Sequence, residues 1–526
     1  MTTHLWSGTA RVTRRMSRAG ALAAATVLLT AFFLPAPAFG AQMADVSDFN
    51  GDGYADLAVG VPGEQLGTRF SAGGVEVIYG SAAGLTSRQS QFWTQDSPGV
   101  KGRADNGGAF GTTHTSGDFD GDGFADLAVG SPAMFGSVTV LYGSRTGLTA
   151  RDQLFSPATL GETELWGSTL AAGDFDGDGH SDLAIGASPA PAGPQPLRGT
   201  LTVLRGSPLG LVTSGAVRVT PQSPGLSGTS APGDIFAAHL AVGDVTGDGR
   251  DDLAFDSHPR SGEGGGVHFL AGSASGLTTD EARFFRSDDP AVVPADTKFS
   301  YLGFALAIAD FDADGHADLA LGDFDAGPPG DTDCMDRAAC PGAVLVLPGA
   351  RTGPTTAGKK LWYQDSPGVP GTSEGADAFG WALAAGDLNG DGRADLAVGA
   401  LGEDLGSGER FDAGSATVLY GSATGLSAVG AQQWTQDSPG VKGAAEGSDY
   451  FGSSLRVLDF DRGESADLAV SSRGEGIGND AEAAGGVNVL YGSGGGVTSR
   501  DQTWNQDTPG IAGSAERYDQ FHVLGQ

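Results

Sequence analysis

Short runs of apolar and β-branched residues bounded by glycine recur along the chain, and this pattern predicts buried β-strands. One such run opens with glycine and closes in a Tyr-Gly-Ser or related turn, as in GSATVLYGSATGLS from Gly414. Nothing after the N-terminal segment keeps a helical period. The run has seven copies, which begin at Gly73, Gly136, Gly199, Gly265, Gly342, Gly414 and Gly485. The pattern therefore predicts an all-β chain built from repeats.

Each repeat holds further elements besides this run. An acidic decapeptide of the type DFDGDGFADL leads into an apolar strand, and its seven copies begin at Asp48, Asp118, Asp174, Asp244, Asp310, Asp387 and Asp459. A large apolar residue lies eight positions before six of them, at Phe110, Trp166, Phe236, Leu302, Phe379 and Phe451. In four repeats a short tryptophan-containing strand ends in Pro-Gly, as in QQWTQDSPG. Four strands in roughly 70 residues are typical of one propeller blade. The sequence thus predicts an all-β, seven-bladed β-propeller with four-stranded blades over residues 41–526.

The tryptophans of these short strands allow two interpretations. Their common register favours packing between blades, because aromatic side chains dominate core energetics. Stacking on sugars, as in lectins, is the alternative. The four residues are Trp93, Trp362, Trp434 and Trp504.

The acidic decapeptide is the motif that carries chemistry. It has oxygen-bearing side chains at positions 1, 3, 5 and 9, and its glycine at position 6 lets the carbonyl of position 7 turn inward. This donor set suits Ca²⁺, and six copies carry it in full, so we predict about six calcium sites. The predicted ligands, with position 7 acting through its backbone carbonyl, are Asp48, Asn50, Asp52, Tyr54 and Asp56; Asp118, Asp120, Asp122, Phe124 and Asp126; Asp174, Asp176, Asp178, His180 and Asp182; Asp244, Thr246, Asp248, Arg250 and Asp252; Asp310, Asp312, Asp314, His316 and Asp318; and Asp387, Asn389, Asp391, Arg393 and Asp395.

Two other interpretations of the decapeptide are weaker. An EF-hand needs a bidentate Glu at position 12 and flanking helices, whereas position 12 here is an apolar strand residue such as Val59. A metal-free acidic β-turn explains one copy more readily than six. The copies also differ from one another. Thr246 at position 3 predicts weaker affinity in the fourth, and Gly463 and Glu464 at positions 5 and 6 predict little or no binding in the seventh.

Residues 1–40 are predicted to be a signal peptide that is removed. Arginines between Arg11 and Arg18 precede an apolar stretch from Ala19 to Leu34, and small residues offer a cleavage site before Ala41. The stretch is shorter than the roughly 20 residues of a membrane span. We therefore expect a secreted, extracellular protein without a membrane anchor, exported by either the general or the twin-arginine route.

The net negative charge of the chain excludes some classes of function. The 526 residues include 64 Asp and Glu against 30 Lys and Arg, which gives a formal net charge of -34. A nucleic-acid binder needs a basic surface, so we expect no nucleic-acid partner. The hydrophobic content of 39% is too high for a disordered acidic tail.

These motifs together resemble FG-GAP repeats, as in the N-terminal propeller of integrin α chains. The resemblance rests on Phe-Gly pairs such as Phe110-Gly111, on the acidic loop, and on Gly-x-Pro after the next strand, as in Gly60-Val61-Pro62. The third copy places its proline one residue later, and the later copies lack it. The resemblance implies a seven-bladed propeller with Ca²⁺ in the hairpin loops between the first two strands of most blades, in a secreted protein of bacterial type. It leaves the function open, because propellers host many activities.

The loops opposite the acidic ones are the predicted binding surface. If the acidic loops join strands one and two, the loops joining strands two and three lie on the other face. These loops are long, over residues 63–72, 323–341, 402–413 and 474–484. Binding residues concentrate in such loops, and in the integrin-like family this face meets ligand, although tolerated insertions are the alternative. We expect a monomeric propeller that binds an extracellular protein or glycan there, as in cell adhesion. Cys334 and Cys340 lie in the longest of these loops and are expected to form a disulfide.

A secreted hydrolase or lyase acting on polysaccharide is the alternative function, although the sequence favours a protein that is not an enzyme. The one G-x-S-x-G match, around Ser373, lacks the strand-to-helix turn that a nucleophilic serine needs. His180 and His316 occupy position 7 of acidic loops, and we expect their imidazoles to face solvent. No catalytic residue is predicted.

The two chain ends are predicted to close the ring. The first acidic loop has no apolar lead-in residue, because Gly40 holds that position. The C-terminal GSAERYDQFHVLGQ parallels GAAEGSDYFGSSLR and places Phe521 where Phe451 would lie. We expect residues 514–526 to supply the missing lead-in of the first blade and protect its strand edge, with a frayed terminus as the alternative.

Overall fold

The computed structural model describes residues 47–132, 136–160, 165–188, 199–227, 234–259, 264–294, 297–328, 334, 340–406, 410–478 and 481–523. The predicted signal peptide, residues 1–40, lies outside the described residues. One compact unit spans Phe39–Gln526. In the part of the chain that the structure describes, no helix is long and apolar enough to cross a membrane.

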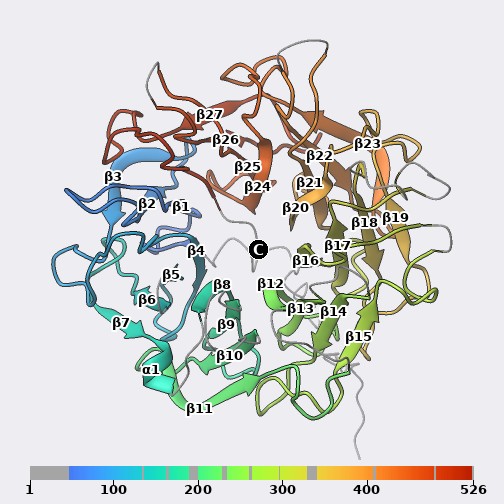
Figure 1. Ribbon diagram of the computed structural model, residues 1–526, viewed down its shortest axis with the longest axis horizontal. Helices are drawn as coiled ribbons and strands as arrows, with labels where there is room; N and C mark the ends of the chain where they lie inside the picture. The colour runs from blue at the N-terminus through green and yellow to red at the C-terminus, as the bar shows by residue number, and fades with distance from the viewer. Residues whose placement is uncertain are drawn as a thin grey trace, which may run out of the picture. The chain divides into compact units, whose positions relative to one another are not determined.

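The unit consists of seven antiparallel sheets in which strands pair in sequence order, six of them with four strands and the first with three. Figure 1 shows the sheets arranged as a ring, with the first strand of each four-stranded sheet toward the axis. This confirms the predicted all-β, seven-bladed propeller. The strands are, blade by blade, β1 (Leu57–Val61), β2 (Gly74–Tyr79) and β3 (Thr86–Trp93); β4 (Thr113–Gly117), β5 (Asp126–Ser131), β6 (Ser137–Leu141) and β7 (Asp152–Phe155); β8 (Leu165–Gly173), β9 (Asp182–Ser188), β10 (Thr200–Arg205) and β11 (Val212–Val219); β12 (Ile235–Gly243), β13 (Asp252–His258), β14 (Gly266–Leu270) and β15 (Arg283–Arg286); β16 (Ala305–Ala309), β17 (Asp318–Asp323), β18 (Ala343–Leu347) and β19 (Lys360–Trp362); β20 (Phe379–Gly386), β21 (Asp395–Ala400), β22 (Ser415–Tyr420) and β23 (Ser427–Trp434); and β24 (Phe451–Leu458), β25 (Asp467–Ser472), β26 (Gly486–Leu490) and β27 (Asp501–Trp504). A single helical turn, α1 (Pro157–Leu160), follows β7.

The hydrophobic core lies between neighbouring blades. The second and third strands of a blade are buried on both sides, which explains why they read as continuous apolar runs rather than alternating ones. The lead-in residues fill the gap between blades: Phe110 is fully buried against Val75 and Val77 of the preceding blade. The four tryptophans of the short outer strands pack against these clusters, which confirms the packing interpretation.

The glycine that opens each third-strand run is required because the neighbouring blade leaves no room for a side chain. Gly73 has a φ of +84°, and a Cβ atom there would lie 2.2 Å from the carbonyl oxygen of Phe110 in the next blade. Any side chain would therefore clash with backbone. Gly414 bridges to Phe451 in the same way, so this glycine marks the contact between consecutive blades.

The C-terminal segment closes the ring over its described residues 514–523, as predicted; residues 524–526 lie outside the described part of the chain. The backbone N–H of Phe521 donates to the carbonyl of Ala484 (2.8 Å), as that of Phe451 does to Ala413 (2.9 Å). His522 pairs with Gly60 of β1 in an antiparallel bridge, and Phe521 is fully buried in a cluster with Val59. The segment thus takes the inner-strand position that the first sheet lacks.

The predicted disulfide between Cys334 and Cys340 is present. Both half-cystines are buried, and the bond ties a loop between β17 and β18. The residues between the cysteines lie outside the described part of the chain.

Phe521→Ala tests the closure. We expect it to lower the free energy of unfolding by about 3–5 kcal/mol, because it leaves a cavity in a fully buried site. Tyr518→Ala, in the same segment but with a side chain that is 50% exposed, is the matched control and should change stability little. Thermal denaturation with size-exclusion chromatography measures both. Equal melting of the two variants and the parent would refute the closure.

Candidate metal centres in the acidic loops

The acidic loops lie at one end of the blades. Each of the second to seventh loops joins the first strand of a blade to the second, as between β4 and β5, and the first loop precedes β1. Six loops have glycine at position 6 with a φ between +83° and +88°, which a residue with a side chain rarely adopts. The predicted turn role of this glycine is confirmed.

Backbone hydrogen bonds hold the carboxylates at positions 1 and 5 of the motif in place. In the second loop the N–H groups of Asp122 and Gly123 donate to the two carboxylate oxygens of Asp118, at 3.1 and 2.9 Å. The N–H of Phe124 donates to Asp122 (3.1 Å). The same three bonds occur in all six complete loops.

The aspartate at position 9 is the most buried acidic residue of the motif. Asp126 is 1% exposed, and its two oxygens accept the N–H groups of Phe119 and Gly143, both at 2.9 Å. It therefore ties the loop to the end of the third strand, a structural role that sequence reasoning did not assign. Burial raises the pKa of Asp126 to about 8, and the nearby Asp120 and Asp118 carboxylates add to the rise. Since a carboxylate oxygen has two lone pairs, these bonds still leave room for a cation.

The oxygens that remain fit a hard cation. Oδ1 of Asp120 and Oγ1 of Thr246, both at position 3, are buried and accept or donate no hydrogen bond among the described residues. Buried polar atoms of this kind normally have a partner. In four loops three carboxylates bring oxygens within 4.8 Å of one another: Asp118, Asp120 and Asp122; Asp174, Asp176 and Asp182; Asp310, Asp312 and Asp314; and Asp459, Asp461 and Asp467. These all-oxygen groups are consistent with Ca²⁺.

The seventh loop keeps the cluster of carboxylates that three other loops have, but in the described structure it lacks most of their ordering hydrogen bonds. Its three aspartates converge, which the sequence did not predict. Of the three loop-shaping bonds, however, only that from the N–H of Gly463 to Asp459 is present among the described residues. Glu464 does not take a positive φ, and Gly463 has no carboxylate to receive an N–H group. The loop keeps acidic groups without the turn that orders them.

Side chains at position 7 pack onto the loop of the preceding blade. A Cβ atom on Gly51 would lie 2.5 Å from the Phe124 ring, and one on Gly247 would lie 2.5 Å from the His316 ring. The side chain of His180 is only 19% exposed and Nδ1 lies 2.9 Å from Asp178 Oδ1. The expectation that His180 and His316 face solvent is therefore wrong. The side chain at position 7 turns toward the loop of the neighbouring blade.

A ring of backbone hydrogen bonds joins all seven loops. The N–H of position 8 donates to the carbonyl of position 1 in the preceding blade, as from Ala125 to Asp48 (3.0 Å). The bond from Ala55 to Asp459 (3.0 Å) closes the ring between the first and seventh blades. Each loop is thereby positioned by its neighbour.

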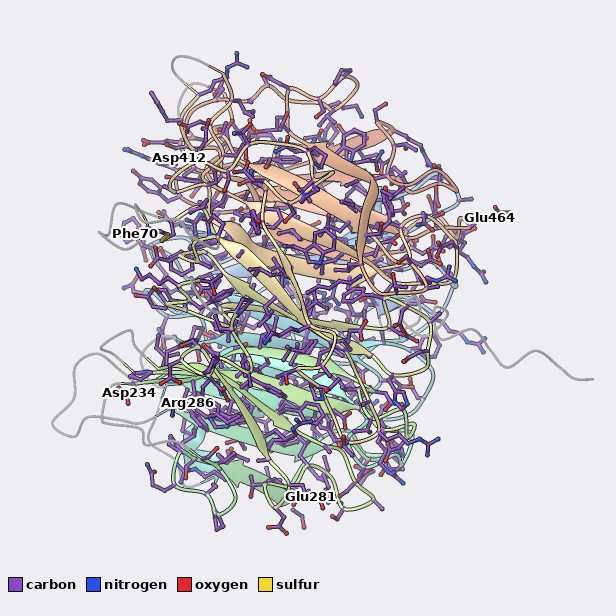
Figure 2. The ribbon with its side chains drawn as sticks, turned by 90° about the vertical axis from the view of Figure 1, so that its right-hand side faces the viewer. Phe70, Asp234, Glu281, Arg286, Asp412 and Glu464 are labelled. Atoms are coloured by element: carbon purple, nitrogen blue, oxygen red, sulfur yellow. A yellow bond between two sulfur atoms is a disulfide. The ribbon has the colours of Figure 1, made fainter. Side chains whose placement is uncertain are left out.

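The described parts of the long loops lie on the opposite face, as predicted. Figure 2 shows Glu464 of the seventh acidic loop on one side of the blades, and Phe70 and Asp412 of the loops after β1 and β21 on the other. Ser373 lies in the loop between β19 and β20, where the described structure has no strand-to-helix turn.

The repeats match two family models. The model described as FG-GAP repeat matches residues 39–75 and 379–419, and that described as FG-GAP-like repeat matches residues 118–185. The chain is an FG-GAP repeat protein. The matches begin near or at acidic loops and continue into the strands that follow, so the family rests on the motifs described above.

Curated relatives fall into two groups. Phosphatidylinositol-glycan-specific phospholipase D of Rattus norvegicus is 36% identical over 154 residues, which is 28% of this chain and 18% of the relative. Integrin alpha-PS2 of Drosophila melanogaster is 30% identical over 220 residues, or 40% of this chain and 15% of the relative. Integrin alpha-7 of Rattus norvegicus is 30% identical over 210 residues, with 39% and 17% covered. The FG-GAP chain thus matches less than a fifth of the length of each.

Calcium removal should destabilise the FG-GAP propeller. Binding to the folded state contributes about 2.7 kcal/mol per site at about a hundredfold excess over Kd, and without the cation the carboxylates of each loop repel. We expect a clearly lower melting temperature in EGTA than in calcium. Identical melting curves would rule out calcium in the loops.

Ion counting tests the loops one by one. Asp122→Ala should remove one calcium ion, and Asp461→Ala in the seventh loop, which lacks the ordering turn, should remove none. Native mass spectrometry of the parent and both variants gives the counts. Loss of an ion from the Asp461 variant would contradict the distinction between the loops.

Proposed function

We propose that this FG-GAP propeller is a secreted, calcium-stabilised binding module whose face opposite the acidic loops takes a macromolecular ligand, either an extracellular protein or a glycan. One observation supports this most directly. A group of aromatic side chains lies together on that face and keeps accessible surface.

The aromatic group comes from two neighbouring blades. Phe304 precedes β16, Phe324 follows β17, and Trp381 lies near the start of β20, so all three lie at the strand ends away from the acidic loops. The ring centroids of Phe304 and Phe324 are 4.6 Å apart, and those of Phe304 and Trp381 are 4.7 Å apart. Tyr301 stacks on Phe324 at 5.0 Å. All four residues are only partly buried.

A cation contacts this aromatic group, and further exposed rings lie on the same face. The guanidinium of Arg473, after β25, lies 5.6 Å from the Trp381 ring centroid and 5.1 Å from that of Tyr450. Phe70 and Phe411 are 68% and 62% exposed in the long loops of the first and sixth blades. Aromatic residues and arginine are enriched among the residues that dominate binding energy in protein interfaces. Such rings also stack on sugars, so the surface suits either class of ligand.

A specific observation favours an enzyme as the second candidate. The buried carboxylate of Asp256 lies 3.0 Å from Nδ1 of His239 and 3.6 Å from Nε2 of His258. The His239 ring contacts Phe304 at 4.7 Å and its side chain is 34% exposed. An imidazole held by a buried carboxylate beside an accessible surface can act as a general base. A polysaccharide hydrolase or lyase would use this pair.

Substitution of the aromatic group tests the binding proposal. Ligands are first selected by screening the calcium-loaded parent against glycan and extracellular-protein arrays. Phe304→Ser with Trp381→Ser should then weaken binding about tenfold or more. Leu209→Ser is the matched control, because Leu209 is 79% exposed but its loop contacts the acidic loop at Phe119 on the other face. Unchanged binding by the aromatic variant would refute the proposal.

A further variant, His239→Ala, separates the enzyme from the binding module. If the face only binds, His239→Ala should change affinity modestly through its contact with Phe304, and neither the parent nor the variant should form a cleavage product. If the protein instead cleaves a polysaccharide, loss of product formation in His239→Ala with retained affinity would assign the reaction to this pair.

A further inference from the structure

A pocket lies where the first blade meets the inner strands of the second and seventh blades. It is small and is lined by Arg456 of β24, His114 and Ser116 of β4, Ser47, and Val523 of the C-terminal segment. Figure 1 shows β4 and β24 on either side of β1 near the axis. The inner strands of the other blades have five to nine residues, whereas the described part of the first blade has only the bridge at His522 in that position. The pocket occurs at this incomplete strand.

Arg456 in this pocket has no partner among the residues that the structure describes. Its guanidinium takes part in no ion pair or hydrogen bond, although nine other arginines of this acidic chain pair with a carboxylate. Burial lowers the pKa of Arg456 to about 10, and no nearby carboxylate raises it. The Arg456 side chain is half-buried, and no side chain of the described residues balances its charge, so the site suits a small anion from solution.

The other polar groups of the pocket also suit a negative ligand. His114 has a buried Nε2 without a partner, and burial together with Arg456 and His522 lowers its pKa to about 3. The hydroxyls of Ser47 and Ser116 share one hydrogen bond (2.8 Å), so one of the two protons remains to be donated. Asp56 lines the pocket too, but its oxygens accept the N–H groups of Phe49 and Gly80, both at 2.9 Å, within its own blade.

We propose that this pocket is a binding site for a small anion of the size of chloride, held by the Arg456 guanidinium with the Ser47 and Ser116 hydroxyls. The anion neutralises the unpartnered cation at the seam between the chain ends. It thereby stabilises the closed ring, independently of the ligand face and of the acidic loops.

Thermal unfolding in matched salts tests this site. The full chain is loaded with calcium gluconate and melted in sodium chloride or in sodium gluconate, whose anion is too large for the pocket, at equal ionic strength. We expect chloride at about 200 mM to raise the melting temperature of the parent by about 1–3 °C over gluconate. Arg456→Met should abolish this difference. Arg473→Met removes an exposed arginine from the same blade, and it should keep the difference.

A direct measurement covers the case in which the Arg456 variant does not fold. Crystals of the parent grown in bromide should show anomalous density beside the Arg456 guanidinium. Absence of that density together with equal melting in the two salts overturns the proposal.

Discussion

The contact between consecutive blades is the constraint on which the rest of this propeller depends. A blade of three or four strands cannot bury both of its faces alone, so each one needs neighbours on both sides. The lead-in residues and the third-strand glycines meet this need by bringing backbone against backbone, as between Gly73 and Phe110. Because seven blades return to the first, one faulty contact would expose an unpaired edge. The contact of Gly485 with Phe521 completes the circle with the same geometry.

The acidic loops depend on that contact in turn. The carbonyl of each first aspartate receives an N–H group from the next blade, while its carboxylate orders its own loop. One residue thus serves both the blade contact and the candidate cation site. A cation that draws the carboxylates of one loop together also fixes the backbone to which the next blade is bonded. Calcium binding and blade packing are therefore expected to be coupled around the ring rather than confined to separate loops.

The repeated features could be predicted from sequence because each one appears several times in one register. The strands, the turn glycines, the burial of Phe110 and its equivalents, and the closing role of Phe521 all follow from aligning the repeats with one another. Features that occur once could not be found in this way. Phe304, Phe324 and Trp381 are separate positions in the chain, and only the curvature of the ring brings their side chains together. Position-7 side chains such as His316 were misplaced because their contacts are with another repeat.

Departures from the repeat therefore mark the places where this chain has properties of its own. Residues that are the same in every blade at one position form the common scaffold. A residue that differs there, while the fold is kept, can have a separate role. Arg456 breaks the pattern of small and apolar inner-strand residues such as Ala384, and it does so at the seam where the two chain ends meet. In the aromatic group, Phe304 and Trp381 likewise stand where Thr112 and Ser453 follow the Phe-Gly pair in other blades. The two departures lie at different parts of the ring, so the seam and the ligand face can vary independently while the seven blade contacts remain the same.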